Sequence, residues 1–294
     1  MGAFLTPQVS MPPSLHSGQL DEIAPGVRRL VANNAGYMTG PGTNTYLLGT
    51  RRFAIIDPGP DAVPHVERIL AETGGRIDAV LVTHTHLDHS PAAATLAART
   101  GAKLLGRVAG GGKQDEGFRP TRLLQDDDLI EVDVEGDGLS LRALHTPGHA
   151  SNHLCYLLTG TGLLFTGDHL MQGSTVVIAP PDGNMGDYLR SLRRLQTEPV
   201  SRIAPGHGLT IEDAQSEITR IIGHRLQREA KVMERLTASG LVSLDELVTR
   251  VYDDVDPRLH VVARGSLLAH LQKLAADGRV QQSSASADAK WSVR

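Results

Sequence analysis

The chain has 294 residues, of which 40% are hydrophobic and 21% charged, a composition typical of a globular protein with one or two domains. Its net charge of −4 argues against a large basic surface for nucleic acid or membranes, and the lack of any run of about 18 apolar residues argues against a transmembrane helix. With one cysteine, Cys155, no disulfide can form within the chain, and the first residues lack the basic head and apolar core of a secretory signal. We therefore expect a cytoplasmic protein with no membrane partner.

The first two thirds of the chain alternate short apolar runs with helical patterns. Residues 1–18 are rich in Pro, Ser and Gly and are expected to form a flexible tail. Apolar runs bounded by turn residues predict strands at 43–49, 51–60, 77–84, 102–106, 139–145, 153–159, 162–168 and 202–208. Helical patterns occupy 63–74, 90–100 and 186–196, the second with Ser90 as its N-cap and Pro91 at its first position. Strands separated by helices predict layered sheets covered by helices, in a domain over residues 19–222.

The pattern becomes helical from about Ile211 onward. One long helix is expected over 211–239, ended by Gly240, and amphipathic helical segments follow at 243–254 and 259–278. Residues 279–294 have the pattern of two strands around a polar turn, so that residues 223–294 form a linking helix and a small winged-helix-like domain. Residues 224–294 contain eleven Lys or Arg and nine Asp or Glu, so the module carries little net positive charge. A module that binds DNA is usually more basic, and we therefore favour packing on the core, dimerisation or a wall of the substrate cleft.

The stretch "VTHTHLDHSP" places His84, His86, Asp88 and His89 directly after a buried apolar run. Imidazole nitrogens and carboxylate oxygens are ligands of zinc and of other borderline divalent ions. Several donors that leave one strand end can converge at little cost in loop closure. Four donors in the order His-x-His-x-Asp-His are therefore strong evidence for part of a metal site.

Three further candidate ligands stand at later strand ends. They are His149 in "HTPGHASNH", Asp168 in "LLFTGDH" and His207 in "IAPGHG". Each follows a glycine, which lets the backbone approach a site closely. Seven donors exceed the four ligands that one zinc ion usually takes, so we expect two divalent ions, zinc by default with manganese or iron as alternatives, bridged by one carboxylate.

This ordered set resembles the metallo-β-lactamase superfamily. The resemblance implies a four-layer αββα sandwich of the α/β class with a dinuclear site at one sheet edge. By the motif of that superfamily, His84, His86 and His149 would hold the first ion and Asp88, His89 and His207 the second, with Asp168 between them.

A closer likeness extends over nearly the whole chain. "GTNTYLLG", "IIDPGP", "FTGDHLMQGSTVV", "GHRLQREAKVMERL" and the final "KWSVR" resemble the endoribonuclease-like β-lactamase-like protein 2 group, including its C-terminal winged-helix-like domain. Members of that group include single-strand RNA endonucleases, and relatives release acyl chains as thioesterases. Asn152 departs from the acidic residue expected in some relatives.

Two residues are candidates for catalysis beyond metal binding. Asp88 is placed to orient the nucleophile as well as to ligate. His153 is a candidate proton donor to the leaving group, and the alternative is a packed or hydrogen-bonded histidine. A structural role is expected for His169, which follows Asp168.

Four basic residues, Arg225, Arg228, Lys231 and Arg235, repeat at helical spacing along the long helix. We expect a solvated face with Glu229 and Glu234 as partners. The alternative is recognition of a phosphate or carboxylate by an arginine face.

Two divalent ions would make a bridging hydroxide available near neutral pH for attack on phosphorus or a carbonyl carbon. The surrounding pocket decides which kind of substrate bond is cleaved, and we expect loops 107–122 and 170–187 and the C-terminal module to form it. Cleavage of single-stranded RNA is the first hypothesis, although few aromatic residues and the net negative charge count against it. Hydrolysis of an acyl thioester or small ester is the second, because the apolar segment 169–181 suits an acyl chain. A non-catalytic metal-binding module is the least favoured, and a homodimer is possible.

Overall fold

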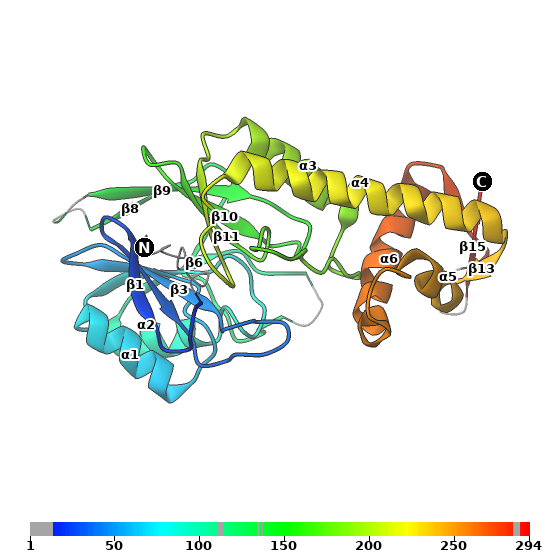
Figure 1. Cartoon of the computed structure of the whole chain (residues 1–294). Coiled ribbons are helices and arrows are strands. Elements are labelled where there is room, and N and C mark those ends of the chain that lie inside the picture. Colours follow the sequence, from blue (N-terminus) through cyan, green and yellow to red (C-terminus); the bar gives the residue numbers. More distant parts are fainter. Residues whose placement is uncertain (1–13, 111–113, 134–135, 137, 285–288) are drawn as a thin grey trace, which may run out of the picture.

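The computed structural model describes residues 14–110, 114–133, 136, 138–284 and 289–294, so most of the expected N-terminal tail lies outside the described residues. Two β-sheets pack face to face, and each carries helices on its outer face (Figure 1). A long helix leaves this sandwich and ends in a smaller helical module at the C-terminus (Figure 1).

The first sheet has seven strands in sequential order from β1 to β7. The pairs from β1 to β4 are antiparallel and those from β4 to β7 parallel, because helices α1 and α2 supply the crossover connections of two parallel pairs. The bounds are β1 Leu20–Ala24, β2 Val27–Val31, β3 Asn44–Leu48, β4 Phe53–Ile56, α1 Val63–Thr73, β5 Ile77–Leu81, α2 Ala92–Thr100, β6 Lys103–Gly106 and β7 Arg122–Leu123.

Three features of this sheet differ from the prediction. Strands β1 and β2 were not predicted, because charged residues interrupt the apolar pattern of "LDEIA" and "VRRLV". The edge strand β7 was not predicted either, because two residues are too few to show a strand pattern. The expected N-cap of α2 is wrong: Pro91 occupies the cap position, and the Ser90 hydroxyl donates instead to Asp115 over 2.8 Å.

The second sheet has five strands in the order β12-β11-β10-β9-β8. The strands expected at 153–159 and 162–168 form the antiparallel hairpin β10–β11, which turns at Gly160–Gly162, and β12 joins β11 in parallel after α3. The bounds are β8 Leu129–Val132, β9 Leu139–His145, β10 Leu154–Leu158, β11 Leu163–Gly167, α3 Met185–Thr197, β12 Arg202–Pro205 and α4 Ala214–Ser239. Helices α3 and α4 cover the outer face of this sheet (Figure 1).

Apolar residues form three layers in this sandwich. One lies between the sheets, where the rings of Tyr46 and Phe165 meet edge to face at 4.9 Å. The other two lie between each sheet and its own helices. This confirms the layered sheets that the sequence pattern predicted and the αββα arrangement that the family resemblance implied.

The C-terminal module packs around the far end of α4. Its elements are β13 Val242–Ser243, α5 Leu244–Val251, the short 3₁₀ helix η1 Pro257–Leu259, α6 His260–Ala276, β14 Val280–Gln282 and β15 Lys290–Val293. Strands β14 and β15 form the predicted hairpin, and β13 pairs with β15 as a third strand. Trp291 and Leu247 belong to the core that joins these elements to α4, so the module has the expected winged-helix outline.

The longest described helix, α4, carries charged residues along its whole length. Across the described parts of the chain, no helix has the length and apolar character needed to cross a membrane.

Candidate metal centre

The seven predicted ligands lie together at one edge of the sandwich. Four of them follow β5 of the first sheet, and the others follow β9, β11 and β12 of the second. Backbone hydrogen bonds join the two sheets beside the site: Leu154 N–H donates to the Thr83 carbonyl over 2.7 Å, and Asn44 N–H of β3 donates to the Gly206 carbonyl over 2.8 Å. Residues 123 positions apart in the sequence thus face one site.

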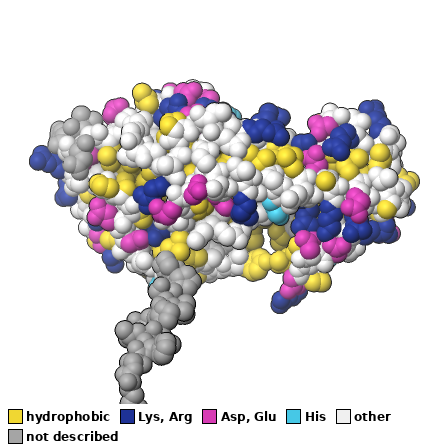
Figure 2. Space-filling view, turned by 45° about the horizontal axis from the view of Figure 1, so that its top comes forward, with side chains coloured by type: hydrophobic (Ala, Val, Ile, Leu, Met, Phe, Trp, Pro, Cys, Tyr) yellow, Lys and Arg dark blue, Asp and Glu magenta, His cyan; other side chains and the backbone are white. Residues whose placement is uncertain are grey.

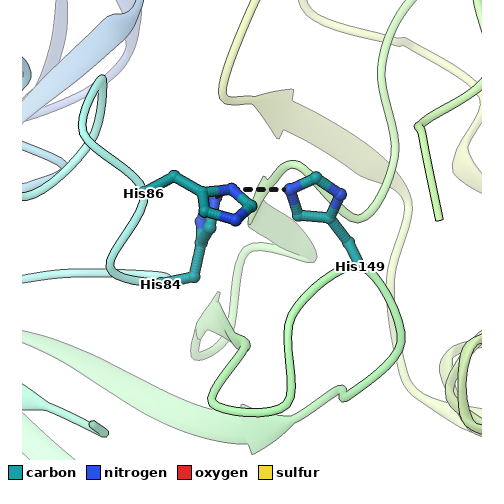
Figure 3. A group of neighbouring side chains, drawn as sticks. All are labelled: His84, His86 and His149. Carbon is teal, nitrogen blue, oxygen red and sulfur yellow. Dashed lines mark hydrogen bonds between the residues drawn. The ribbon is translucent and has the colours of Figure 1, made fainter. Parts of the chain in front are cut away.

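The first group of donors is formed by His84, His86 and His149. Nδ1 of His86 lies 2.9 Å from Nε2 of His84 and 3.0 Å from Nε2 of His149 (Figure 3). The three rings meet nearly edge to face. Three nitrogens therefore converge on one point.

The second group is formed by Asp88, His89 and His207. Oδ2 of Asp88 lies 3.4 Å from Nε2 of His207 and 3.7 Å from Nε2 of His89. One donor atom from each of these residues lies within 4.8 Å of the other two.

Asp168 lies between the two groups. Its Oδ1 is 3.4 Å from Nε2 of both His89 and His207, and its Oδ2 is 3.7 Å from Nε2 of His149. Each carboxylate oxygen thus faces a different group, which is the placement of a bridging ligand.

Unpaired polar atoms test whether this cluster suits a cation. Nε2 of His89, Nε2 of His207 and Oδ1 of Asp168 are buried and have no hydrogen-bond partner among the described residues. A buried polar atom without a partner costs about 1–3 kcal/mol. A bound cation would satisfy all three atoms, so the residues fit a metal site.

Contacts behind the cluster set which ring nitrogen faces the site. Nδ1 of His149 donates to the Val177 carbonyl over 2.7 Å, and Nδ1 of His207 donates to the Gly42 carbonyl over 3.2 Å. Because a carbonyl only accepts, Nδ1 carries the proton and Nε2 keeps its lone pair for a metal.

Asp57, which sequence reasoning did not single out, has the same role for His89. Its Oδ2 lies 2.9 Å from Nδ1 of His89, and its two oxygens accept hydrogen bonds from the Thr83 N–H over 2.7 Å and the Thr83 hydroxyl over 2.8 Å. Its backbone is left-handed, with φ of 50°. The only sequence signal was its position in "IIDPGP", and its contact with His89 arises because β4 and β5 are neighbours.

The charges of the cluster favour cation binding. Burial, with the neighbouring His89 and His86, holds the pKa of His84 well below its usual range, and burial lowers the pKa of His86 to about 4. Burial alone would raise the pKa of the two carboxyls, but His89 and His207 lower that of Asp88 to about 2 and hold that of Asp168 well below its usual range. Neutral His84 and His86 beside ionised carboxylates are forms that bind divalent ions. Burial alone would lower the pKa of His89 and His207, but the neighbouring carboxylates Asp88 and Asp168 raise both, so these two imidazoles release a proton when a cation binds.

A family model described as the metallo-beta-lactamase superfamily matches residues 38–207, more than half of the chain. The chain belongs to the metallo-β-lactamase superfamily. Members of this superfamily are hydrolases, and the protein is an enzyme of that class. A second model, described as the beta-lactamase associated winged helix domain, matches residues 243–291.

Relatives confirm the resemblance to the β-lactamase-like protein 2 group. A Drosophila melanogaster protein named Beta-lactamase-like protein 2 homolog is 31% identical over 278 residues, which cover 91% of this chain and 93% of its own. An Aspergillus chevalieri protein named Atrochrysone carboxyl ACP thioesterase is 31% identical over 293 residues, covering 94% and 89%. A solved structure, a beta-lactamase domain protein from Burkholderia ambifaria, has a TM-score of 0.79 at 21% identity and covers 98% of this chain and 96% of that one, a likeness of fold.

A cavity of about 1050 Å³ opens on the metal-site residues of this metallo-β-lactamase fold. His86, Asp88, His149 and Asp168 line one end, and the C-terminal module lines the other. Figure 2 shows a hollow with hydrophobic side chains between the sandwich and that module. Of the segments expected to build the pocket, 170–187 and the C-terminal module supply much of this lining, and the described part of loop 107–122 supplies Gln114. The exposed side chains of Tyr37 and Met38, which the sequence did not indicate, also line the cavity.

The remaining candidate residues lie behind this cavity. His153 is buried, its ring stacks on His84 with centroids 5.1 Å apart, and its Nδ1 lies 3.0 Å from the Thr146 hydroxyl. It is not among the described residues that line the cavity. His169 is buried against the Tyr188 ring at 4.8 Å, as a structural residue would be.

Asn152, the position that departs from some relatives, is also buried. Its side-chain amide donates to the Thr85 hydroxyl over 2.8 Å and to the Arg107 carbonyl over 3.0 Å. It therefore connects the loop after β5 with the loop after β6.

The expectation of a fully solvated basic face on α4 is wrong. Arg225 and Arg228 are 3% and 9% exposed, because α4 runs along the cavity and the C-terminal helices cover it. Arg228 pairs with Asp254 over 2.7 Å, and Glu229 pairs with Lys273 and Arg279 from the module. Periodicity alone does not reveal which side of a helix a later domain covers.

Replacing Gly148 with Ala is expected to disturb the site without removing a ligand. Gly148 precedes His149 and has φ of 152°, and an added Cβ would lie 2.5 Å from the Cα of Tyr188. Because the obstacle is α3 backbone, we expect a loss of about 1–3 kcal/mol in the free energy of unfolding, together with weaker metal binding. Thermal unfolding and metal titration would measure both.

Gly160→Ala is the matched control, since Gly160 also has positive φ but no atom within 4 Å of the added Cβ. If the two variants behaved alike, backbone strain rather than the contact with α3 would explain the loss.

Proposed function

We propose that the protein hydrolyses acyl thioesters at a dinuclear metal centre. The observation that carries this proposal is the apolar cavity that opens directly on the clustered histidines and aspartates. The name of the A. chevalieri relative, a thioesterase that is 31% identical over 94% of this chain, supports the same class of bond.

The two groups of donors support one assignment of the ligands. His84, His86 and His149 would hold one ion, Asp88, His89 and His207 the other, and Asp168 would bridge them. When bound, two divalent ions supply Lewis acidity and make a coordinated water more acidic. Zinc is the default for this nitrogen-rich set, and manganese or iron would also fit.

The chain's own residues provide orientation. Asp88 is ionised and lines the cavity. Its carboxylate can therefore accept a hydrogen bond from the O–H of an attacking water and orient that water. His153 stacks on the back of His84, which fits a role in fixing that ring. Its role as a proton donor to the leaving group stays a prediction.

The cavity wall suits an acyl chain. Val176, Val177 and Ala179 line it from the loop after β11, and Val255 and Val262 line it from the C-terminal module. Burial of each methylene group of an acyl chain contributes about 0.8 kcal/mol. The loop residues belong to the segment 169–181 that the sequence proposed for this purpose.

Cleavage of single-stranded RNA, which the sequence placed first, now ranks second. Single strands are bound by basic grooves with aromatic platforms. Two arginines of the cavity wall, Arg220 and Arg228, are already paired with Glu217 and Asp254. RNA cleavage and a homodimer both stay predictions, whereas a non-catalytic binding module does not agree with membership of a hydrolase superfamily.

Metal-loaded protein should release free thiol from acyl-CoA thioesters, with kcat/KM rising as the acyl chain lengthens from two to about eight carbons. The release can be followed with a thiol reagent, because the only cysteine, Cys155, is buried and burial raises its pKa to about 12. An end-labelled single-stranded RNA would be tested in parallel. Cleavage of the RNA with no thiol release would reject the thioesterase proposal and favour the nuclease.

A further inference from the structure

Arg225 is a buried cation in the cavity wall without a carboxylate partner among the described residues. Its side chain is 3% exposed and lines the cavity. Its Nη2 donates to the carbonyl oxygen of Val176, whereas Nε has no hydrogen-bond partner in the described part of the chain. The guanidinium carbon lies 5.4 Å from the centre of the Tyr188 ring. Because a buried charge is costly without an opposite charge, the environment of Arg225 is incomplete without an anion.

The other cations of the cavity wall are already neutralised. Arg220 pairs with Glu217 over 2.6 Å, and Arg228 pairs with Asp254 over 2.7 Å. Burial, with Arg225 and Arg228 nearby, lowers the pKa of His224, so that this imidazole is neutral at pH 7. Within the described lining, Arg225 is therefore the cation available to a bound molecule.

The position of Arg225 relative to the metal ligands follows from one loop. The Val176 carbonyl accepts from Arg225, and the next carbonyl, that of Val177, accepts from Nδ1 of His149. Consecutive Cα atoms are about 3.8 Å apart, so the guanidinium and a ligand imidazole are attached to neighbouring peptide groups. Both side chains line the same cavity, so a molecule whose reacting carbonyl lies beside His149 can extend toward Arg225 within it.

We propose that Arg225 binds a carboxylate or phosphate group of the substrate and selects for anionic substrates. Guanidinium groups bind both anions in a bidentate manner. The anion has two possible sources: the distal carboxylate of a dicarboxylic acyl group, or the phosphate of a pantetheine-type thiol. This proposal rests on the proposed thioesterase function only for the bond that is cleaved. The anion-binding site is inferred from the burial and contacts of Arg225 and does not depend on that bond.

Binding of matched ligand pairs to the metal-loaded protein tests this proposal without turnover. Succinamate, which has an amide in place of the thioester and a free distal carboxylate, is compared with the neutral butyramide for the acyl side, and 4′-phosphopantetheine with pantetheine for the thiol side, by calorimetry. In the parent protein, the anionic member of one pair should bind at least about tenfold more tightly than its partner, and the pair that shows this preference identifies the source of the anion.

Three variants separate the charge of Arg225 from its structural contact. Arg225→Gln removes the charge and keeps a donor for the Val176 carbonyl, so it should abolish the preference. Arg225→Lys should retain part of it. Arg235→Met, which removes a positive charge from a partly exposed position of the same helix that is not among the described cavity-lining residues, should leave the preference unchanged.

Two results would overturn the proposal. One is the same preference ratio in the parent and in Arg225→Gln. The other is an equal loss for both members of a pair in Arg225→Gln, which would mean that Arg225 only holds the loop. If no thioester were hydrolysed but the preference disappeared in Arg225→Gln, the thioesterase proposal would fail while the anion site would stand.

Discussion

Replacing Asp168 with Asn is expected to lower hydrolysis by about 10³-fold, equivalent to about 4 kcal/mol in the activation barrier. Asp168 places one oxygen toward His89 and His207 and the other toward His149. An amide of the same size has one oxygen and no charge, and its NH₂ group would face either one donor group or the other. We therefore also expect the metal content to fall from two ions per chain to one or fewer, measured by elemental analysis after dialysis.

Asp245→Asn is the matched control for this variant, because the Asp245 side chain is 75% exposed and lies on the C-terminal module. It should keep the parent's metal content and rate. Retention of two ions and the parental rate by Asp168→Asn would contradict the bridging role.

Replacing Asp57 with Asn is expected to weaken metal binding by about 10- to 100-fold, although Asp57 is not a proposed ligand. Asn has the same size and tolerates the left-handed backbone at this position, so the exchange isolates the carboxylate. Its NH₂ group would face Nδ1 of His89, where Oδ2 now lies 2.9 Å away. His89 would then have to accept at Nδ1 and carry its proton on Nε2, which removes the lone pair from the site.

Competition with a chromophoric chelator would measure the metal affinity of Asp57→Asn, and thermal unfolding would report on its fold. Asp78→Asn, at a half-exposed carboxylate on β5 of the same sheet, is the control. A lower unfolding temperature with unchanged metal affinity would show that Asp57 only connects β4 to the segment after β5.

Much of the fold could be predicted because its strands are short apolar runs separated by glycine, proline and helical patterns. The buried strand β5 and the hairpin β10–β11 are examples. Strands at the sheet edge were missed, since β1 contains Asp21 and Glu22 and its residues are only partly buried. A half-exposed edge strand needs no continuous apolar pattern. Strand β1 is therefore recognised from its pairing with β2 and not from its own residues.

The metal-site residues could be predicted because each ligand stands at a strand end in a chemically specific motif. Their supporting contacts could not. The Val177 carbonyl that holds His149 and the Gly42 carbonyl that holds His207 are backbone groups, which every residue has. Asp57 is one of many aspartates in the chain, and only the pairing of β4 with β5 brings it to His89.

The sequence by itself determined the donor types, their order along the chain and the layered class of the fold, because strand periodicity and ligand chemistry are local properties. The tertiary structure alone decided which oxygen of Asp168 faces which group, which ring nitrogens point inward, and that Arg225 is buried in the cavity wall. These features depend on contacts between segments far apart in the sequence, where helix α4 and the C-terminal module close over the site.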